Sequence, residues 1–263
     1  MGGSLLGRSA LCTMRGERNM TAHYGGFQPV GSVPATSPRA VRWASGAADT
    51  VPGMSLTLHV GNKRYSSWSL RPYLALAHTG LAFETQLILL DRPTTRAEIA
   101  AVNPAGRLPV LHHDGVVIWD SIAICEYLNE LAPAAQLWPA DRARRARARA
   151  ISAEMHAGFT ALRSNMPMDL CADRNGQGHT PEALADARRV FEIWRDALAA
   201  SGGPFLFGAF TIADAMFAPV TTRFTTYGVE LDATCRGYVD AIAALPAMIA
   251  WRRDAAAEPA RAA

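Results

Sequence analysis

The sequence is poor in cysteine and has no long apolar run, and each shortage excludes a class of protein. Its 263 residues include four cysteines. These lie far apart, so the chain encodes neither a disulfide scaffold nor a CxxC metal or redox site. The longest uncharged stretch of the C-terminal half, residues 197–213, is interrupted by serine, glycine and proline and is shorter than the roughly 20 apolar residues that a membrane span needs. We therefore expect a protein of the reducing cytoplasm, with no membrane-spanning helix and no metal site.

The sequence also lacks the excess of basic charge that dedicated nucleic-acid-binding proteins carry. Lys and Arg total 26 against 23 Asp and Glu, a formal charge of +3, so no nucleic-acid partner is expected. The excess lies within residues 1–53, a mixture of Gly, Ser, Pro, Arg and Ala without helix or strand periodicity. We interpret this segment as outside the fold, either a disordered extension or the result of a mis-assigned start with Met54 as the true initiator. A targeting peptide fits less well, because no uninterrupted apolar region is present.

Apolar periodicity divides the rest of the chain into two parts. After residue 53 it predicts a strand, a helix that ends at Gly80 and a second strand over 83–89, an order typical of a parallel pair. The Asp-Gly dipeptide at 114–115 stands between two apolar runs and predicts a β-hairpin, followed by a helix from Asp120. Beyond Pro133 only helical periodicity remains.

The second part is predicted to be all-helical. An Ala- and Arg-rich helix is expected over 140–166, with its arginines on a solvated face, and further helices are expected near Pro181, Thr211, Asp232 and Pro246. The predicted fold class is therefore an α/β domain followed by an all-α domain. The expected boundaries are 54–133 for the α/β domain, 134–140 for a linker, 141–258 for the all-helical domain and 259–263 for a tail.

Three serines, Ser66, Ser67 and Ser69, stand close to the start of the first predicted helix. Proline is tolerated in the first turn of a helix and not further inside, so Pro72 places these serines at the helix N-terminus. Unpaired backbone N–H groups and the helix dipole favour an anion there, and serine hydroxyls add donors. A helix cap and a solvated serine would explain the same residues without any ligand.

Two further segments offer groups at the same edge of the predicted sheet. Pro109 removes a backbone donor where the third strand begins, which favours an edge position or a cis peptide bond in the turn before it. The backbone around Leu108 is then free to pair with an extended ligand. Asp120 and Ser121, at the start of the next helix, present a carboxylate and a hydroxyl suited to an ammonium and a carboxylate.

Four motifs of this chain occur together in one known family. They are SSWSLR over 66–71, GRLPVL over 106–111, DSIAI over 120–124 and FGAFTIAD over 207–214. The chain resembles the cytosolic glutathione transferases over about residues 54–258, and the first motif is similar to the serine-type motif of the zeta class. The resemblance implies a thioredoxin-like N-terminal domain that binds glutathione, a helical domain that holds an electrophilic co-substrate, and a homodimer. It implies no cofactor besides glutathione itself.

The resemblance also implies roles for single residues. Ser66 would donate a hydrogen bond to the glutathione thiolate, with Ser67 as the close competitor, and Arg71 would anchor the loop or add positive potential. Glutathione would be held by Leu108, Pro109, Asp120 and Ser121, the second substrate would be held by Met155, His156, Phe159 and Arg163, and Thr211 and Asp214 would form a structural capping box.

The predicted function is that of a detoxifying glutathione transferase, which activates the thiol for attack on an electrophilic small molecule. Two alternatives remain open, a glutathione-dependent isomerase of the maleylacetoacetate type and a non-catalytic interaction protein of the same fold. Trp68 stands where the zeta motif has cysteine, which argues against the isomerase. The serines and Asp120 argue for an enzyme, because an interaction module would not need them.

Overall fold

The computed structural model describes residues 56–259 of the chain. The interpretations of residues 1–53 and of Met54 lie outside the described residues, as do the last four positions of the predicted tail. Within the described part, the predicted order of an α/β half followed by helices is confirmed.

Four strands form one mixed sheet. β1 (Leu56–Val60) runs parallel to β2 (Glu84–Leu87) on one side and antiparallel to β3 (Val110–His113) on the other, and β4 (Val116–Trp119) forms the edge next to β3. Both residues of the turn between β3 and β4 have positive φ, 46° and 82°, as a tight hairpin turn with the twist of its strands requires. The predicted parallel pair and the predicted hairpin are both confirmed.

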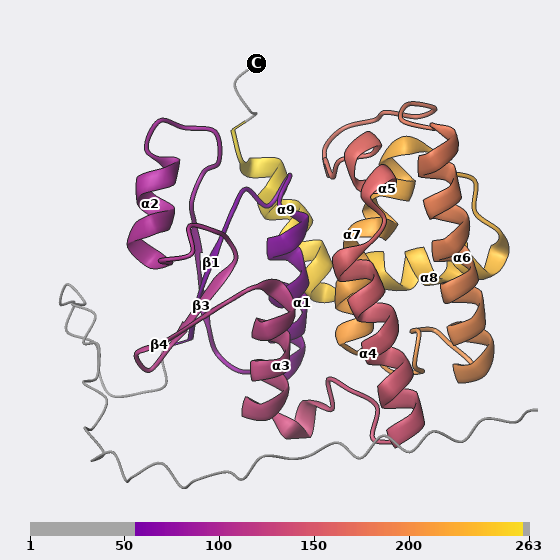
Figure 1. Cartoon of the computed structure of the whole chain (residues 1–263), viewed down its shortest axis with the longest axis horizontal. Coiled ribbons are helices and arrows are strands. Elements are labelled where there is room, and N and C mark those ends of the chain that lie inside the picture. Colours follow the sequence, from indigo (N-terminus) through magenta and orange to yellow (C-terminus); the bar gives the residue numbers. More distant parts are fainter. Residues whose placement is uncertain (1–55, 260–263) are drawn as a thin grey trace, which may run out of the picture. The chain divides into compact units, whose positions relative to one another are not determined.

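Three helices cover this sheet. α1 (Ser67–Thr79) and α3 (Ser121–Leu131) pack against each other on one face, and α2 (Thr95–Val102) lies on the other side (Figure 1). α1 ends as predicted, at Gly80 in the left-handed conformation. The sequence did not predict α2, because its one buried residue, Ile99, leaves no periodic apolar stripe to recognise.

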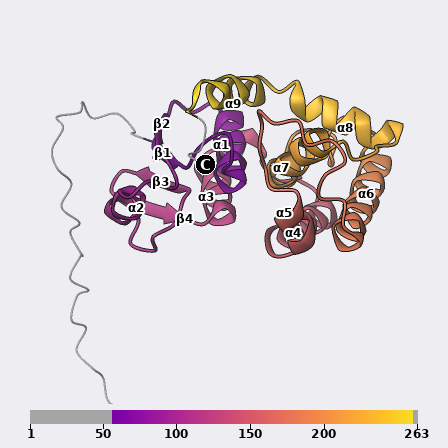
Figure 2. The ribbon, with the colours of Figure 1, turned by 90° about the horizontal axis from the view of Figure 1, so that it is seen from above.

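The described chain after α3 is helical apart from its loops, and one helix forms its centre. Every residue of α7 except Thr225 is buried, and α7 packs against both α1 and α4 (Figure 2). The two halves therefore share one hydrophobic core. The elements are η1 (Pro133–Ala135), α4 (Arg142–Ala157), α5 (Thr160–Asn165), α6 (Pro181–Ser201), α7 (Ile212–Tyr227), α8 (Ala233–Ala243) and α9 (Pro246–Ala257).

The single long helix predicted over 140–166 is wrong, because the structure divides it into α4 and α5. α4 ends at Gly158, and Phe159 takes the left-handed conformation with φ of 57°. A Cβ atom at Gly158 would lie 2.8 Å from the carbonyl oxygen of Glu154, so any larger residue would require the backbone to shift at this break. Apolar residues continue across the break, which is why periodicity alone did not reveal it.

α7 begins with a capping box formed by Thr211 and Asp214. The Asp214 carboxylate is fully buried and accepts hydrogen bonds from the Thr211 N–H at 2.8 Å, the Thr211 hydroxyl at 2.9 Å and the Leu206 N–H at 3.0 Å. Burial raises the pKa of this carboxyl to about 6, although the donors favour its charged form. The box therefore ties the loop before α7 to the helix and serves packing.

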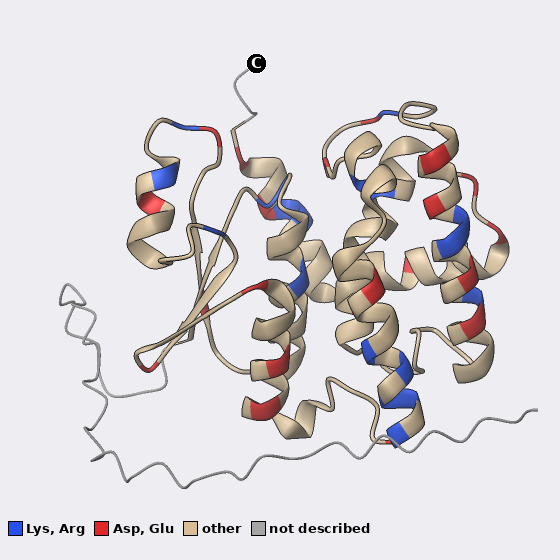
Figure 3. Ribbon diagram, viewed as in Figure 1, with Lys and Arg blue, Asp and Glu red and all other residues tan. Residues whose placement is uncertain are grey.

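The arginines of α4 are exposed to solvent, except for Arg145, which is half-buried (Figure 3). Arg149 pairs with Glu126 at 3.3 Å and Arg147 with Asp196 at 3.7 Å, and about half of each arginine side chain is exposed. The solvated face predicted for this basic run is confirmed. None of the described helices has the length and apolar character that a membrane span requires.

Candidate active site

The start of α1 uses two of its serines to hold itself together. Ser66 is the N-cap, and its hydroxyl accepts from the Ser69 N–H at 3.3 Å and donates to Ser69 Oγ at 2.7 Å. Ser69 is fully buried, and its hydroxyl accepts from the Gly61 N–H at 3.1 Å. Both hydroxyls are thus engaged in fixing the loop between β1 and α1. The serines lie at the helix N-terminus as predicted, but the reason given for it was wrong, because Pro72 lies in the second turn of the helix and not in the first.

Ser67 differs from its neighbours. Its side chain is mostly buried but lines a cavity of about 410 Å³, and its hydroxyl makes no hydrogen bond to any other described residue. It stands at the first residue of α1, where the helix dipole and unpaired N–H groups attract negative charge. Of the serines in this loop, Ser67 has the hydroxyl that is available to a ligand.

Arg71 is buried behind this site. Its side chain is fully inaccessible, and its guanidinium carbon lies 4.3 Å from the centre of the Trp68 ring. Nε and Nη1 have no hydrogen-bond partner among the described residues. Burial, and then the charges of Arg223 and Arg163, lower the pKa of Arg71 to about 9. A desolvated positive charge therefore stands close to the start of α1.

Pro109 lies next to the same loop. The Leu108–Pro109 peptide bond is cis, and of the two alternatives for this proline the edge position is excluded, since β3 lies between β1 and β4. Val110 pairs with His59, so Pro109 stands beside the end of β1. The sheet register thus brings the segment at Leu108 to the loop that carries the serines.

Asp120 and Ser121 form the start of α3. Asp120 is the N-cap, and its carboxylate accepts from the Ile122 N–H at 2.9 Å. Its backbone φ of 72° is one that residues other than glycine rarely adopt, and such backbone conformations cluster at functional sites. Ser121 is buried, and its Oγ has no partner among the described residues. A buried hydroxyl without a partner at a helix N-terminus suits an anionic ligand group.

His156, near the end of α4, connects the two helix starts. Its Nε2 lies 3.5 Å from Asp120 Oδ2, and its ring packs edge-on against Trp68 with the ring centres 5.2 Å apart. The residues predicted from α1 and α3 are therefore brought together, and the helical half contributes to the same place.

Of the four residues predicted to hold the second substrate, one lines the cavity at Ser67. Arg163 lines it, whereas Met155 and Phe159 are buried in the hydrophobic core and do not. Their apolar side chains fill the space between helices, so the prediction that they form the pocket is not supported. The structure adds Arg223, which the sequence did not indicate, because it lies 60 residues from Arg163 and nothing in its local pattern shows that the two meet. The full lining is Tyr65, Ser67, Trp68, Thr160, Arg163, Ser164, Pro167, Met168 and Arg223.

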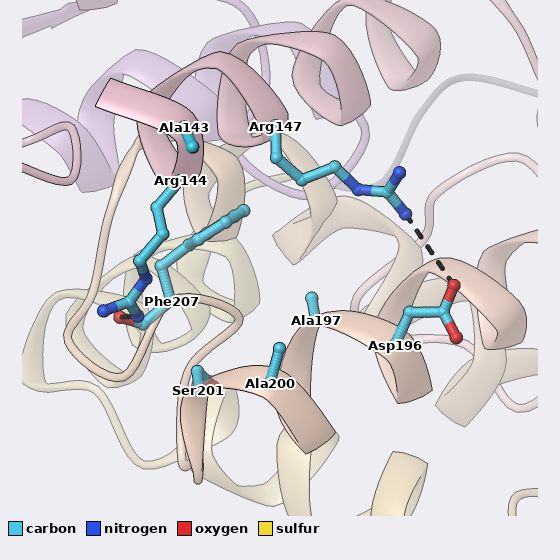
Figure 4. A pocket seen from close by; sticks show the side chains of 8 residues that line it. All are labelled: Ala143, Arg144, Arg147, Asp196, Ala197, Ala200, Ser201 and Phe207. Carbon is cyan, nitrogen blue, oxygen red and sulfur yellow. Dashed lines mark hydrogen bonds and ion pairs between the residues drawn. The ribbon is translucent and has the colours of Figure 1, made fainter. Parts of the chain in front are cut away.

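A second hollow, of about 360 Å³, lies between α4 and α6 and contains none of the predicted site residues. Its arginines have partners: Arg147 points toward Asp196, and Arg144 donates to the carbonyl oxygen of Phe207 at 2.7 Å (Figure 4). It offers no unpartnered polar group, so we place the candidate active site at Ser67.

Comparison with known proteins identifies the family. The family model described as "Glutathione S-transferase, N-terminal domain" matches residues 65–131, and "Glutathione S-transferase, C-terminal domain" matches residues 177–254. The maleylacetoacetate isomerase of Pseudomonas aeruginosa is 31% identical over 195 residues, which cover 69% of this chain and 89% of that protein. The chain belongs to the glutathione S-transferase family.

Other similar proteins agree with this assignment. A probable maleylacetoacetate isomerase of Caenorhabditis elegans is 29% identical, covering 72% of this chain and 88% of that protein. The solved structure of a glutathione transferase homolog from Burkholderia, with bound glutathione, is 25% identical with a TM-score of 0.61, and covers 78% of this chain and all of that one. The predicted fold, a thioredoxin-like domain followed by a helical domain, is confirmed for this glutathione S-transferase.

Proposed function

We propose that this glutathione S-transferase stabilises the thiol of glutathione as a thiolate at the start of α1 and presents it to an electrophilic small molecule in the cavity beside Ser67. The observation that carries the proposal is the free hydroxyl of Ser67, placed at a helix N-terminus and facing a cavity. Attack by the sulfur forms a thioether bond at the electrophilic carbon and displaces the leaving group, or adds across an activated double bond.

The chemistry required is small enough for these groups to supply. A free thiol has a pKa of about 8.5, and lowering it by about two units takes about 2.7 kcal/mol. A hydroxyl donor to a charged acceptor contributes about 1.5–3 kcal/mol, and a helix N-terminus about 0.3–1 kcal/mol. The buried charge of Arg71 adds to the positive potential. Together these contributions suffice.

The structure supports Ser67 over Ser66 as the donor. The Ser66 hydroxyl already donates to Ser69 and would have to give up that bond, whereas Ser67 loses nothing. Glutathione itself would be anchored by Ser121 and Asp120, through its γ-glutamyl carboxylate and ammonium group, and by the backbone of Leu108 beside the cis-proline.

The test compares Ser67→Ala with Ser66→Ala. Ser67→Ala is expected to raise the pKa of the bound thiol by about one to two units and to lower turnover at pH 7 about 10- to 100-fold, while glutathione still binds. Ser66→Ala is expected mainly to destabilise the fold, by about 1 kcal/mol, because it removes a helix cap. Ultraviolet absorbance of the bound thiolate against pH, and turnover with a panel of electrophiles, measure these effects.

If Ser66→Ala alone changed the pKa of the bound thiol, Ser66 and not Ser67 would be the hydrogen-bond donor to the thiolate. A protein that binds glutathione and turns over nothing in the panel would be a non-catalytic member of the family.

A second candidate function is glutathione-dependent isomerisation of a double bond, favoured by the relatives named maleylacetoacetate isomerase. In that reaction the thiolate adds and then leaves, so glutathione is not consumed. Product formation without loss of free thiol distinguishes it from transfer.

We also propose that the protein is a cytoplasmic homodimer with a role in detoxification. β4 is one of the two edge strands of the described sheet, and two of its side chains, Val116 at 49% and Trp119 at 47%, are exposed although they are large and apolar. Light scattering measures the mass in solution, and Trp119→Glu is expected to shift it to that of the monomer.

A further inference from the structure

Three arginines from different helices gather around Trp68, and none of them forms an ion pair with a described residue. Arg71 of α1 and Arg163 of α5 lie with their guanidinium carbons 4.3 Å and 4.5 Å from the centre of the Trp68 ring. Arg223 of α7 lines the same cavity as Arg163 and Trp68. The cluster brings three positive charges together.

Burial makes this arrangement costly for the protein alone. Arg71 is fully inaccessible and Arg223 is 4% exposed. Burial, and then the charges of Arg223 and Arg163, lower the pKa of Arg71 to about 9, and burial, followed by the charge of Arg163, lowers the pKa of Arg223 to about 10. Buried charges in proteins are normally paired. No described carboxylate lies within ion-pair distance of the three arginines, so the cluster suits a ligand that brings a negative charge.

The two arginines at the cavity are held firmly in place while part of their hydrogen-bonding capacity stays free. Arg223 donates from Nε to the carbonyl oxygen of Met166 at 2.9 Å and from Nη1 to that of Pro219 at 3.1 Å, which leaves Nη2. Arg163 donates from Nη1 alone, to the carbonyl oxygens of His156 and Gly158 at 3.2 Å and 3.4 Å. These backbone contacts orient both guanidinium groups but neutralise neither.

From this geometry we infer that Arg163 and Arg223 form a carboxylate subsite, so that the electrophilic co-substrate of this transferase is a small organic acid. The inference rests on the proposed function and narrows its substrate class. The planar guanidinium group binds a carboxylate through parallel charge-assisted hydrogen bonds. The hydroxyls of Thr160, Ser164 and Ser67 line the same cavity, and the Trp68 ring supplies an apolar wall for the carbon skeleton.

The placement of the subsite separates it from the groups that hold glutathione. Asp120, Ser121 and Leu108 belong to the sheet half of the protein, whereas Arg163 and Arg223 belong to α5 and α7. Ser67 is on α1, which packs against both α3 and α7. An acid bound by the two arginines would therefore lie next to the proposed thiolate, on the side away from the peptide anchors.

The test uses substrates that differ only in charge. With glutathione, para-(bromomethyl)benzoate is expected to give a kcat/KM about 10- to 100-fold above that of para-(bromomethyl)benzamide, the size of a charge-assisted hydrogen bond. Arg163→Gln is expected to remove that preference through a higher KM for the benzoate, with the benzamide little affected. Arg163→Lys, which keeps the charge, is expected to restore part of it.

Arg145 provides a matched control for Arg163. It is also half-buried, and its Nη1 also donates to two backbone carbonyl oxygens, of Pro139 at 3.0 Å and Ala140 at 2.7 Å, but it lies outside the cavity. Arg145→Gln removes an arginine of the same kind and is expected to change neither substrate's kcat/KM.

A binding experiment separates this inference from the proposed function. Calorimetry measures the unreactive para-toluate against para-toluamide, with and without saturating glutathione, for the wild type and Arg163→Gln. A preference for toluate that Arg163→Gln abolishes supports the subsite, even if neither bromide is turned over, in which case the proposed function alone fails. Equal binding of acid and amide, or a preference that Arg163→Gln leaves intact, overturns the subsite whether or not the enzyme is active.

Discussion

The start of α1 and the start of α7 each contain a completely buried charged side chain, and the two differ in how many of their polar atoms form hydrogen bonds. Asp214 accepts hydrogen bonds from a hydroxyl and two backbone N–H groups of its own chain. Arg71 has two nitrogens without any partner in the described residues. A buried charge whose bonds are complete serves the fold, whereas one whose bonds are incomplete points to a ligand. Burial alone does not distinguish these two kinds of charge, but the number of hydrogen-bond partners does.

The largest effect is expected for Asp214→Ala. It leaves the N–H groups of Leu206 and Thr211 buried and unpaired, and each such group costs about 1–3 kcal/mol, so we expect a loss of about 3–5 kcal/mol in the free energy of unfolding by urea. Asp232 is the matched control, since it caps α8 at an exposed position. Asp232→Ala is expected to cost about 1 kcal/mol, and equal losses in the two variants would contradict the comparison.

A smaller effect is expected from the titration of Asp214. Its pKa is raised to about 6 in the folded protein and is about 3.9 in the unfolded chain. The stability due to its protonated form is therefore fully present below about pH 4 and is lost as the pH rises through 6, by about 3 kcal/mol in total and by about 2 kcal/mol between pH 4.5 and 7.5. Urea unfolding of the wild type and Asp214→Asn at pH 4.5 and 7.5 measures it, and an unchanged pH dependence in Asp214→Asn would assign it to other groups.

Arg71→Met is expected to change the free energy of unfolding of the ligand-free protein by about 1 kcal/mol or less, because an unpaired buried charge is replaced by an apolar side chain of similar length. The increase in Tm on adding glutathione should nevertheless become smaller, since the positive charge near the thiolate is gone. A loss of stability as large as that in Asp214→Ala would show that Arg71 serves the fold.

The smallest effect is expected at the surface hollow between α4 and α6. Arg147 and Asp196 are half or more exposed and 3.7 Å apart, and such pairs contribute about 0–1 kcal/mol, less at high salt. Arg147→Gln should change stability by about 0.5 kcal/mol or less and leave turnover unchanged. A drop in turnover would place chemistry in this second hollow.

Local signals were enough to predict most elements of the fold. Three such signals depend only on neighbours in the chain: the apolar periodicity between residue 53 and Gly80, the Asp-Gly turn and the spacing of Thr211 and Asp214. The structure contains the elements that they predict. α2 and the break at Gly158 were missed, because one has a single buried residue and the other preserves the apolar pattern while the backbone turns.

For the candidate site, the sequence located the segments, but it put Ser66 before Ser67 as the donor to the thiolate, and the structure supports the opposite order. Ser66 and Ser67 are chemically identical neighbours, and only the bond from Ser66 to Ser69 shows that one hydroxyl is occupied. Met155 and Phe159 carry no mark that distinguishes a core side chain from a pocket side chain. Arg223 is 60 residues from Arg163 in the chain, and nothing in its local pattern indicates that the two meet.

The sequence by itself therefore determined the order of elements, the helix starts with their caps and the family, because these depend on spacing over a few residues. Only the tertiary structure decided which serine is free, which arginines lack a counter-charge and which candidate side chains reach the cavity. Hydrogen-bond partners and desolvation are set by groups that are distant in the chain and brought together by packing. In this protein such contacts distinguish the charge of Asp214, which stabilises the fold, from that of Arg71, whose hydrogen bonds are incomplete.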